Sequence, residues 1–106
     1  MSKYIIGVDI GTTSTKAVAF DPNGTGLAYP AVGYPLLTPS PVVAEQDPDE
    51  IYAAVLTVLR EVVRKTQTAP EEVIGVSFSA AMHSLIAVDG AGKPLTRSIT
   101  WADSRA

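Results

Sequence analysis

The chain has 106 residues, 46% of them hydrophobic and 18% charged, which is typical of one small globular domain. Eight Lys and Arg residues against eleven Asp and Glu give a net charge of -3, which argues against nucleic acid or an anionic membrane as a partner. Cysteine is absent, which excludes disulfides and thiolate metal sites. The apolar runs are too short for a membrane span or a signal-peptide core, so we expect a cytoplasmic protein.

The first predicted element is a strand over residues 4–8, which leads into the segment Asp9-Ile10-Gly11-Thr12-Thr13-Ser14-Thr15-Lys16. A strand that ends in a carboxylate and turns through glycine into hydroxyl residues and a lysine supplies N–H groups, hydroxyls, a cation and an anion for Mg²⁺. These are the groups that an ATP phosphate chain requires. We therefore interpret residues 9–16 as a phosphate-binding hairpin. A plain β-hairpin with a Thr-rich tip is the alternative.

The spacing excludes the commonest phosphate-binding loop. A Walker loop places glycine immediately before a Lys-Ser/Thr pair, whereas Lys16 follows Thr15 and precedes Ala17. No G-x-G-x-x-G follows the strand either. Residues 15–20 instead predict a second strand, so that phosphates would lie between two hairpin strands.

A turn at Asp21-Pro22-Asn23-Gly24 then predicts a meander into a third strand. Residues 26–29 and 32–34 carry this strand in broken form, and the prolines around it indicate an edge or a bend. Residues 35–47, which contain several prolines, are predicted to be a loop.

One strong helix is predicted from about residue 48 to 66. Asp47 can cap it, Pro48 suits the first helical position, and Glu50 completes a capping box. Apolar residues then recur at i, i+3 and i+4, namely Ile51, Ala54, Val55, Val58, Leu59, Val62 and Val63. The charged residues between them indicate a solvated helix surface.

Residues 73–79 form a nearly continuous apolar run, which predicts a strand buried on both faces, central in the sheet and parallel to the first strand. Residues 84–89 predict another strand, residues 90–94 a turn, and residues 99–101 a short extended piece. The expected fold class is therefore mixed α/β, with a three-stranded meander, a crossover helix and a buried parallel strand.

Four segments, in this order, resemble the start of the FGGY carbohydrate kinases. They are the hairpin, Glu45-Gln46-Asp47-Pro48, the run from Gly75 to His83, and Trp101-Ala102-Asp103-Ser104-Arg105. The run from Ser79 to Leu85 and the last segment are most similar to gluconate kinases, with xylulose kinases next. The resemblance implies that residues 1–106 are the N-terminal part of the first of two actin-like (ribonuclease H-like) ATPase domains, which enclose a cleft.

The resemblance further implies ATP and Mg²⁺ as cofactors. Asp9 would hold Mg²⁺ through water, and Lys16 would offset charge on the transferred phosphoryl group. The other residues facing the nucleotide phosphates would be Gly11, Thr12, Thr13 and Ser14. The catalytic aspartate and the adenosine pocket are expected beyond Ala106, so this chain would contain no catalytic residue and would be inactive alone.

On the substrate side, the resemblance implies that Met82 and His83 contact the sugar and that Trp101 faces it. Each has a structural alternative, because His83 could be a hydrogen-bonded core histidine, Met82 a core filler and Trp101 a plug at the end of the core. Asp103 and Arg105 are spaced to pair with each other, which favours a structural role.

The implied activity is ATP-dependent phosphorylation of a sugar acid, gluconate to 6-phosphogluconate. A xylulose kinase or another FGGY sugar kinase is the near alternative. From a different class, an actin-like nucleotide-binding module of an assembly or chaperone would share the hairpin but would have no reason to carry the sugar-contacting residues. A small sugar or sugar acid is the expected partner, and a homodimer of the full-length enzyme remains open.

Overall fold

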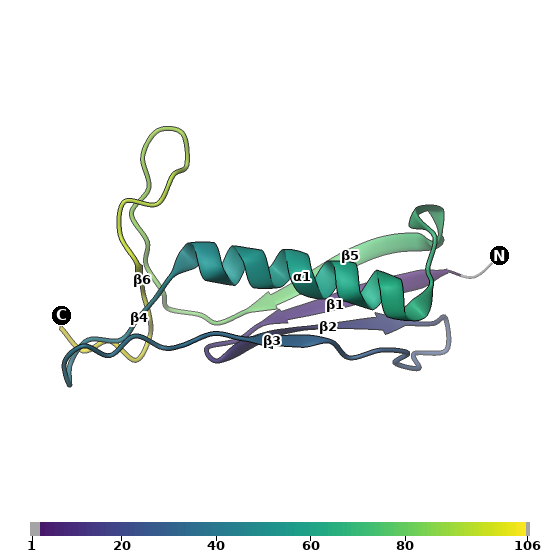
Figure 1. Ribbon diagram of the computed structural model, residues 1–106, viewed down its shortest axis with the longest axis horizontal. Coiled ribbons are helices and arrows are strands. Elements are labelled where there is room, and N and C mark those ends of the chain that lie inside the picture. Colours follow the sequence, from purple (N-terminus) through teal and green to yellow (C-terminus); the bar gives the residue numbers. More distant parts are fainter. Residues whose placement is uncertain (1–2, 106) are drawn as a thin grey trace.

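The computed structural model describes residues 3–105, and its main feature is a four-stranded sheet with the strand order β3-β2-β1-β5. The first three strands form an antiparallel meander, and β5 pairs in parallel with β1. A long helix, α1, lies across one face of this sheet (Figure 1). The mixed α/β fold with its crossover helix is therefore confirmed. The bounds are β1 Tyr4–Ile10, β2 Ser14–Phe20, β3 Ala31–Gly33, α1 Pro48–Thr66, η1 (a short 3₁₀ helix) Pro70–Glu72 and β5 Val73–Ala80.

A second, two-stranded sheet lies beyond the end of β1, on the side of the chain's C-terminus (Figure 1). Its antiparallel strands are β4 (Glu45–Gln46) and β6 (Ser98–Ile99). The expected loop over residues 35–47 therefore contains a strand. The extended piece expected at residues 99–101 corresponds to strand β6, which begins one residue earlier than expected and ends at Ile99.

Two further expected strands are shorter or absent. The third strand is regular only from Ala31 to Gly33, and residues 26–29 are joined to β2 by one isolated bridge and by the bond from Leu27 N–H to the carbonyl of Ala19 (2.9 Å). The strand predicted at residues 84–89 is wrong. Isolated bridges hold that segment in an irregular hairpin, which rises away from the sheet as a projecting arm (Figure 1).

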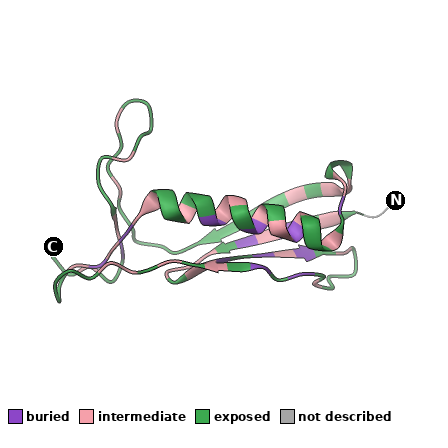
Figure 2. Cartoon of the chain, in the orientation of Figure 1, coloured by how far each residue is buried: buried purple, intermediate pink, exposed green. Residues whose placement is uncertain are grey.

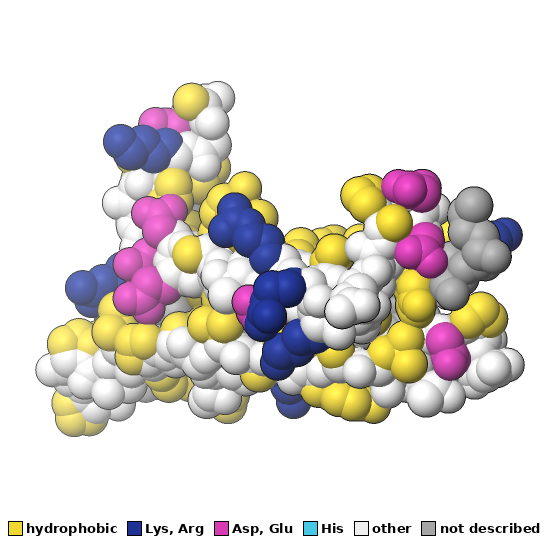
Figure 3. Space-filling model, turned by 45° about the vertical axis from the view of Figure 1, so that its right-hand side comes forward, with side chains coloured by type: hydrophobic (Ala, Val, Ile, Leu, Met, Phe, Trp, Pro, Cys, Tyr) yellow, Lys and Arg dark blue, Asp and Glu magenta, His cyan; other side chains and the backbone are white. Residues whose placement is uncertain are grey.

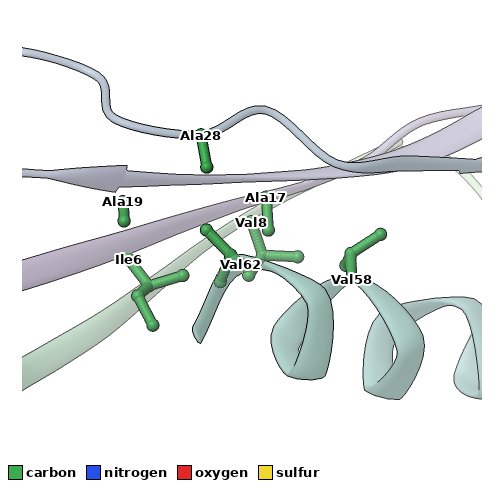
Figure 4. Close-up of a cluster of buried hydrophobic side chains, with 7 residues drawn as sticks. All are labelled: Ile6, Val8, Ala17, Ala19, Ala28, Val58 and Val62. Carbon is green, nitrogen blue, oxygen red and sulfur yellow. The ribbon is translucent and has the colours of Figure 1, made fainter. Parts of the chain in front are cut away.

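The core lies between the helix and one face of the sheet (Figure 2). Side chains alternate along a strand, so every second residue of β1 and β2 faces the helix. From the helix, Val58 and Val62 are one turn apart and point back at the sheet, and both are fully buried. Burying a Val or Ile side chain contributes roughly 1.5–3 kcal/mol. The other members of this cluster are Ile6, Val8, Ala17, Ala19 and Ala28 (Figure 4).

Helix α1 begins and ends where the sequence predicts. The Asp47 carboxylate accepts a hydrogen bond from the N–H of Asp49 (2.9 Å), which caps the helix. The second half of the expected capping box is wrong, because within the described residues Glu50 does not bond back to Asp47. On the outer surface, Arg64 pairs with Glu61 at 2.6 Å. Charged groups stand among apolar ones on the side of the molecule drawn in Figure 3.

Strand β5 differs from its prediction in position. It is parallel to β1 as expected, but it is the edge of the sheet in the described chain, not a central strand. Its apolar side chains Ile74, Val76 and Phe78 are exposed. The reason is the placement of α1, which packs mainly on β2 and β3 and does not extend over β5.

Among the helices in residues 3–105, none combines the length and apolarity needed to cross a membrane.

Candidate functional site

The turn between β1 and β2, residues 11–13, is held by its carbonyl groups. The Tyr34 hydroxyl donates to the carbonyl of Gly11 (2.6 Å), and the Tyr34 N–H donates to the carbonyl of Thr13 (3.1 Å). Between them, the Gln46 side-chain amide donates to the carbonyl of Thr12. All three carbonyl oxygens of the turn are therefore bonded to the body of the protein.

This bonding determines where the N–H groups of the turn point. In a trans peptide the C=O and the following N–H point in opposite directions, and the described chain contains no cis peptide. The inward carbonyls of Gly11 and Thr12 therefore turn the N–H groups of Thr12 and Thr13 outward. No hydrogen bond within the described residues occupies these two N–H groups. Successive free N–H groups form a concave site for an anion, which fits the predicted phosphate-binding role.

Asp9 and Lys16 lie side by side on the sheet face opposite α1. Asp9 is paired with Lys16 of β2 and with Ser79 of β5, so three strands bring a carboxylate, an ammonium and a hydroxyl together. They line one part of an open groove of about 440 Å³, whose remaining wall includes Phe20 and Tyr29. Within residues 3–105 neither Asp9 nor Lys16 forms a direct ion pair, so both charged groups are free to bind a ligand in the groove.

The groups around Asp9 fit a magnesium ion only together with a nucleotide. In the described part of the chain no three His, Cys, Asp or Glu side chains cluster closely enough to hold a metal. Mg²⁺ commonly binds through one or two carboxylates plus substrate phosphates and keeps several waters. A single exposed carboxylate beside the hairpin fits that arrangement, in which phosphates and water would supply the other ligands.

Trp101 lies against the tip of the hairpin. Its indole Nε1 donates to the hydroxyl of Thr12 at 3.1 Å, although the two residues are 89 positions apart. The Trp101 side chain is 59% exposed, so the alternative of a core plug is wrong for the described chain. A residue predicted to face the sugar and one predicted to face the phosphates are thus in direct contact.

Met82 and His83 follow β5 and reach the same end of the sheet. The N–H of Ala81 donates to the carbonyl of Ile10 (2.9 Å), which ties this segment to the end of β1. Leu85 and Ile99 exchange two hydrogen bonds of 2.9 and 2.7 Å, which tie the segment just after His83 to β6, two residues before Trp101. Met82 and His83 are both exposed, so neither is a core residue in this part of the molecule.

The predicted pairing of Asp103 with Arg105 is confirmed. The Asp103 carboxylate accepts from Nε of Arg105 (3.0 Å) and from the Ala44 N–H (2.9 Å). These bonds, that from Arg105 first, hold the pKa of Asp103 well below its usual range. Arg105 also bonds Glu45 at 2.7 Å, and its two carboxylate partners raise its pKa. The cluster anchors the segment after Trp101 to β4.

Sequence reasoning missed Tyr34 and Gln46 as site residues. Tyr34 is 23 positions from Gly11, and Gln46 is 34 positions from Thr12, so no local pattern reveals either contact. The available signals were weak. Gln46 belongs to the Glu45–Pro48 segment on which the family resemblance partly rests, and Tyr34 stands directly before Pro35 in a stretch predicted to bend.

Replacing Tyr34 with Phe is expected to destabilise the full-length protein by roughly 1–2 kcal/mol, because the Gly11 carbonyl and the fully buried Thr15 hydroxyl both lose a partner. Thermal melting measures this loss. Tyr29→Phe is the matched control, since the Tyr29 hydroxyl bonds only the exposed Gly26 carbonyl (3.2 Å). Equal melting temperatures for the two variants would contradict a supporting role for Tyr34.

Comparison with known proteins identifies the family. Residues 4–106 match the FGGY family of carbohydrate kinases, N-terminal domain. Gluconokinase of Bacillus subtilis is 52% identical over 106 residues, and a xylulose kinase of Staphylococcus epidermidis is 33% identical over 105 residues. Each alignment takes in 99% of this chain, but only 20% and 21% of those proteins, respectively.

Among solved structures, gluconate kinase from Lactobacillus acidophilus superposes with a TM-score of 0.89 at 42% identity, over 97% of this chain and 20% of that one. The chain thus spans about a fifth of the length of the relatives it matches. That gluconate kinase and a xylulose kinase from Lactobacillus acidophilus (TM-score 0.87) are sugar kinases with the actin-like ATPase fold, which confirms the fold expected from the sequence. By the match over residues 4–106, this chain belongs to the FGGY family of carbohydrate kinases.

Proposed function

We propose that the full-length protein transfers the γ-phosphoryl group of ATP to a hydroxyl of gluconate, giving 6-phosphogluconate. The observation that carries this proposal is the meeting of two elements at Thr12, namely a hairpin with outward N–H groups and the exposed indole of Trp101. The similarity to gluconokinases favours gluconate within the family, and the xylulose kinases among the relatives define the nearest alternative. Residues 1–106 would form the N-terminal part of the first of two domains.

On the nucleotide side, the phosphates would be bound by the outward N–H groups of Thr12 and Thr13 and by the hydroxyls of the hairpin, including that of Ser14. The N–H of Gly11 donates to the Ser14 carbonyl within the turn (2.8 Å), and a Cβ at Gly11 would meet that same oxygen at 3.0 Å, so Gly11 would shape the turn rather than donate to the phosphates. Lys16 would lie beside the transferred phosphoryl group and offset its charge. Asp9 would hold Mg²⁺ through water. The metal, when bound, neutralises negative charge on the phosphates and helps to orient them for transfer.

On the sugar side, His83 would hydrogen-bond a hydroxyl, Met82 would line the site, and the flat face of Trp101 would pack against the carbon chain. The attacking hydroxyl loses its proton to a general base expected beyond Ala106. A new P–O bond forms to the sugar oxygen while the bond between the γ-phosphorus and the ADP oxygen breaks. Positioning the two substrates in line accounts for much of the rate in such reactions.

Turnover of the full-length protein on gluconate, xylulose and glycerol, followed by ADP release, tests the proposal. We expect the highest kcat/KM for gluconate. Residues 1–106 alone serve as the negative control and should give no gluconate-dependent ADP release, because the general base is missing. Absence of gluconate turnover with activity on xylulose would overturn the choice of substrate. ATP hydrolysis that no sugar stimulates would overturn the kinase assignment.

A further inference from the structure

The tip of the hairpin is connected to the second sheet through a single residue, Thr12. Gln46, on strand β4, donates from its amide to the main-chain carbonyl of Thr12. Trp101, two residues after strand β6, donates from Nε1 to the hydroxyl of Thr12 at 3.1 Å. The backbone of Thr12 is thus held by strand β4 and its side chain by the segment that follows β6, and both lie outside the sheet that contains the hairpin.

Gln46 is an unusual residue for its position, since it is only 6% exposed. Burying a side-chain amide costs free energy unless the amide is hydrogen-bonded, and ordering a long flexible side chain adds an entropic cost. Its bonded partner is the turn predicted to bind phosphate. An apolar residue would fill the same space at lower cost, so the amide bond itself is the feature that needs explanation.

The bond to Thr12 controls the peptide between Thr12 and Thr13. Because the carbonyl of this peptide is held toward Gln46, its N–H, which belongs to Thr13, is held in the opposite direction. The Trp101 bond acts on the side chain in a similar way. Since the Thr12 oxygen accepts from the indole, the Thr12 O–H points elsewhere and can donate to another acceptor.

We propose that Gln46 is a positioning residue for the nucleotide phosphates, acting through the Thr12 peptide, and that the Trp101 N–H has the same function at the Thr12 hydroxyl. The inference rests on the proposed function insofar as the hairpin binds ATP. It goes further in assigning the indole N–H to the phosphate side, which leaves only the ring face of Trp101 for the sugar. The two substrate sites then share Thr12.

The test uses the full-length protein with Gln46 changed to Met, which has a similar shape and no amide donor. The dissociation constant for a non-hydrolysable ATP analogue with Mg²⁺ is measured by calorimetry in the absence of sugar. We expect it to rise about tenfold, because a pre-oriented N–H donor to a charged group is lost. The gluconate KM should stay within about twofold of wild type, because the amide of Gln46 is bonded to the Thr12 carbonyl on the proposed nucleotide side.

Thr68→Val is the matched control for stability. Thr68 is 7% exposed, and its hydroxyl bonds that of Thr66 at the far end of α1, away from the hairpin. This variant should lower the melting temperature without changing nucleotide affinity. Trp101→Phe is a second test variant that keeps an aromatic ring at an exposed position. It should weaken analogue binding several-fold while changing the gluconate KM less.

Gln46→Met with a lowered melting temperature but wild-type analogue affinity would overturn the proposal for Gln46. If that variant does not fold, Gln46→Glu, which keeps the length of the side chain and replaces the amide donor with a carboxylate, is measured instead, and unchanged affinity there overturns the proposal for Gln46. Unchanged affinity in Trp101→Phe overturns the proposal for the Trp101 N–H. A different outcome would show that the kinase assignment is wrong. A full-length protein that phosphorylates no sugar, yet binds the analogue more weakly after either change, would support this inference and refute the proposed function. A wild-type protein that does not bind the analogue would overturn both.

Discussion

Replacing Asp9 with Asn in the full-length protein is expected to lower kcat about a hundredfold or more. Asn is nearly isosteric but neutral, so it keeps the fold and weakens the hold on hydrated Mg²⁺. Asp9 is exposed at the end of β1 and forms no ion pair within the described residues, so its charge is not needed for folding of this region. The melting temperature should therefore remain close to that of the wild type.

Steady-state kinetics over a range of Mg²⁺ concentrations measures this effect. We expect the Asp9 variant to require more Mg²⁺ and to keep a low kcat at saturation. Asp49→Asn is a suitable control, because Asp49 is an exposed carboxylate in the first turn of α1, outside the groove that Asp9 lines. A near wild-type kcat for Asp9→Asn would mean that the carboxylate is only a strand-end residue and would remove the metal role proposed for it.

The elements that the sequence predicts correctly are those whose structure depends on residues close together in the chain. Helix α1 has its cap, its first-turn proline and its apolar period within residues 47–66, and the structure places it over the predicted residues. The β1–β2 hairpin likewise depends on a short turn between two apolar strands. In both cases the signals that predict the element, a cap and apolar period for the helix and a short polar turn for the hairpin, lie close together in the sequence.

The errors arise where the outcome depends on distant packing. The apolar run of β5 predicts a strand buried on both faces, but apolar character does not reveal which elements cover a strand, and α1 covers β2 and β3 instead. Residues 84–89 have strand-like composition, yet they lack a partner strand over their length and are held by isolated bridges. Composition indicates which segments can form strands, whereas the topology of the fold decides which of them find a partner strand.

The candidate site shows the same difference between features set by neighbouring residues and features set by distant packing. The hairpin with Asp9 and Lys16 could be predicted because its chemistry lies within eight residues. Its contacts with Tyr34, Gln46 and Trp101 span 23, 34 and 89 positions, and only the fold brings them together. The resemblance to a family predicts Trp101 as a site residue, whereas the partner of its indole N–H, the Thr12 hydroxyl, is seen only in the structure.

The second large effect is expected at His83. If the imidazole hydrogen-bonds a sugar hydroxyl, His83→Asn should lower kcat/KM for the sugar by the equivalent of roughly 1–3 kcal/mol, while KM for ATP stays nearly unchanged. The histidine is exposed in the described chain, so removing it leaves no buried group unsatisfied and the melting temperature should not fall. Kinetics for each substrate and one thermal melt measure both quantities.

The backbone at His83 provides an internal control. Its φ of 61° lies in the left-handed region, which Asn adopts more readily than most side chains. His83→Asn and His83→Gln should therefore both impair sugar turnover, but only the Gln variant should also lower the melting temperature, since it adds backbone strain. The Gln variant could instead be less stable while neither variant alters the sugar kcat/KM. In that case His83 would stabilise the turn after β5 and would not bind the substrate, and its proposed site role would be wrong.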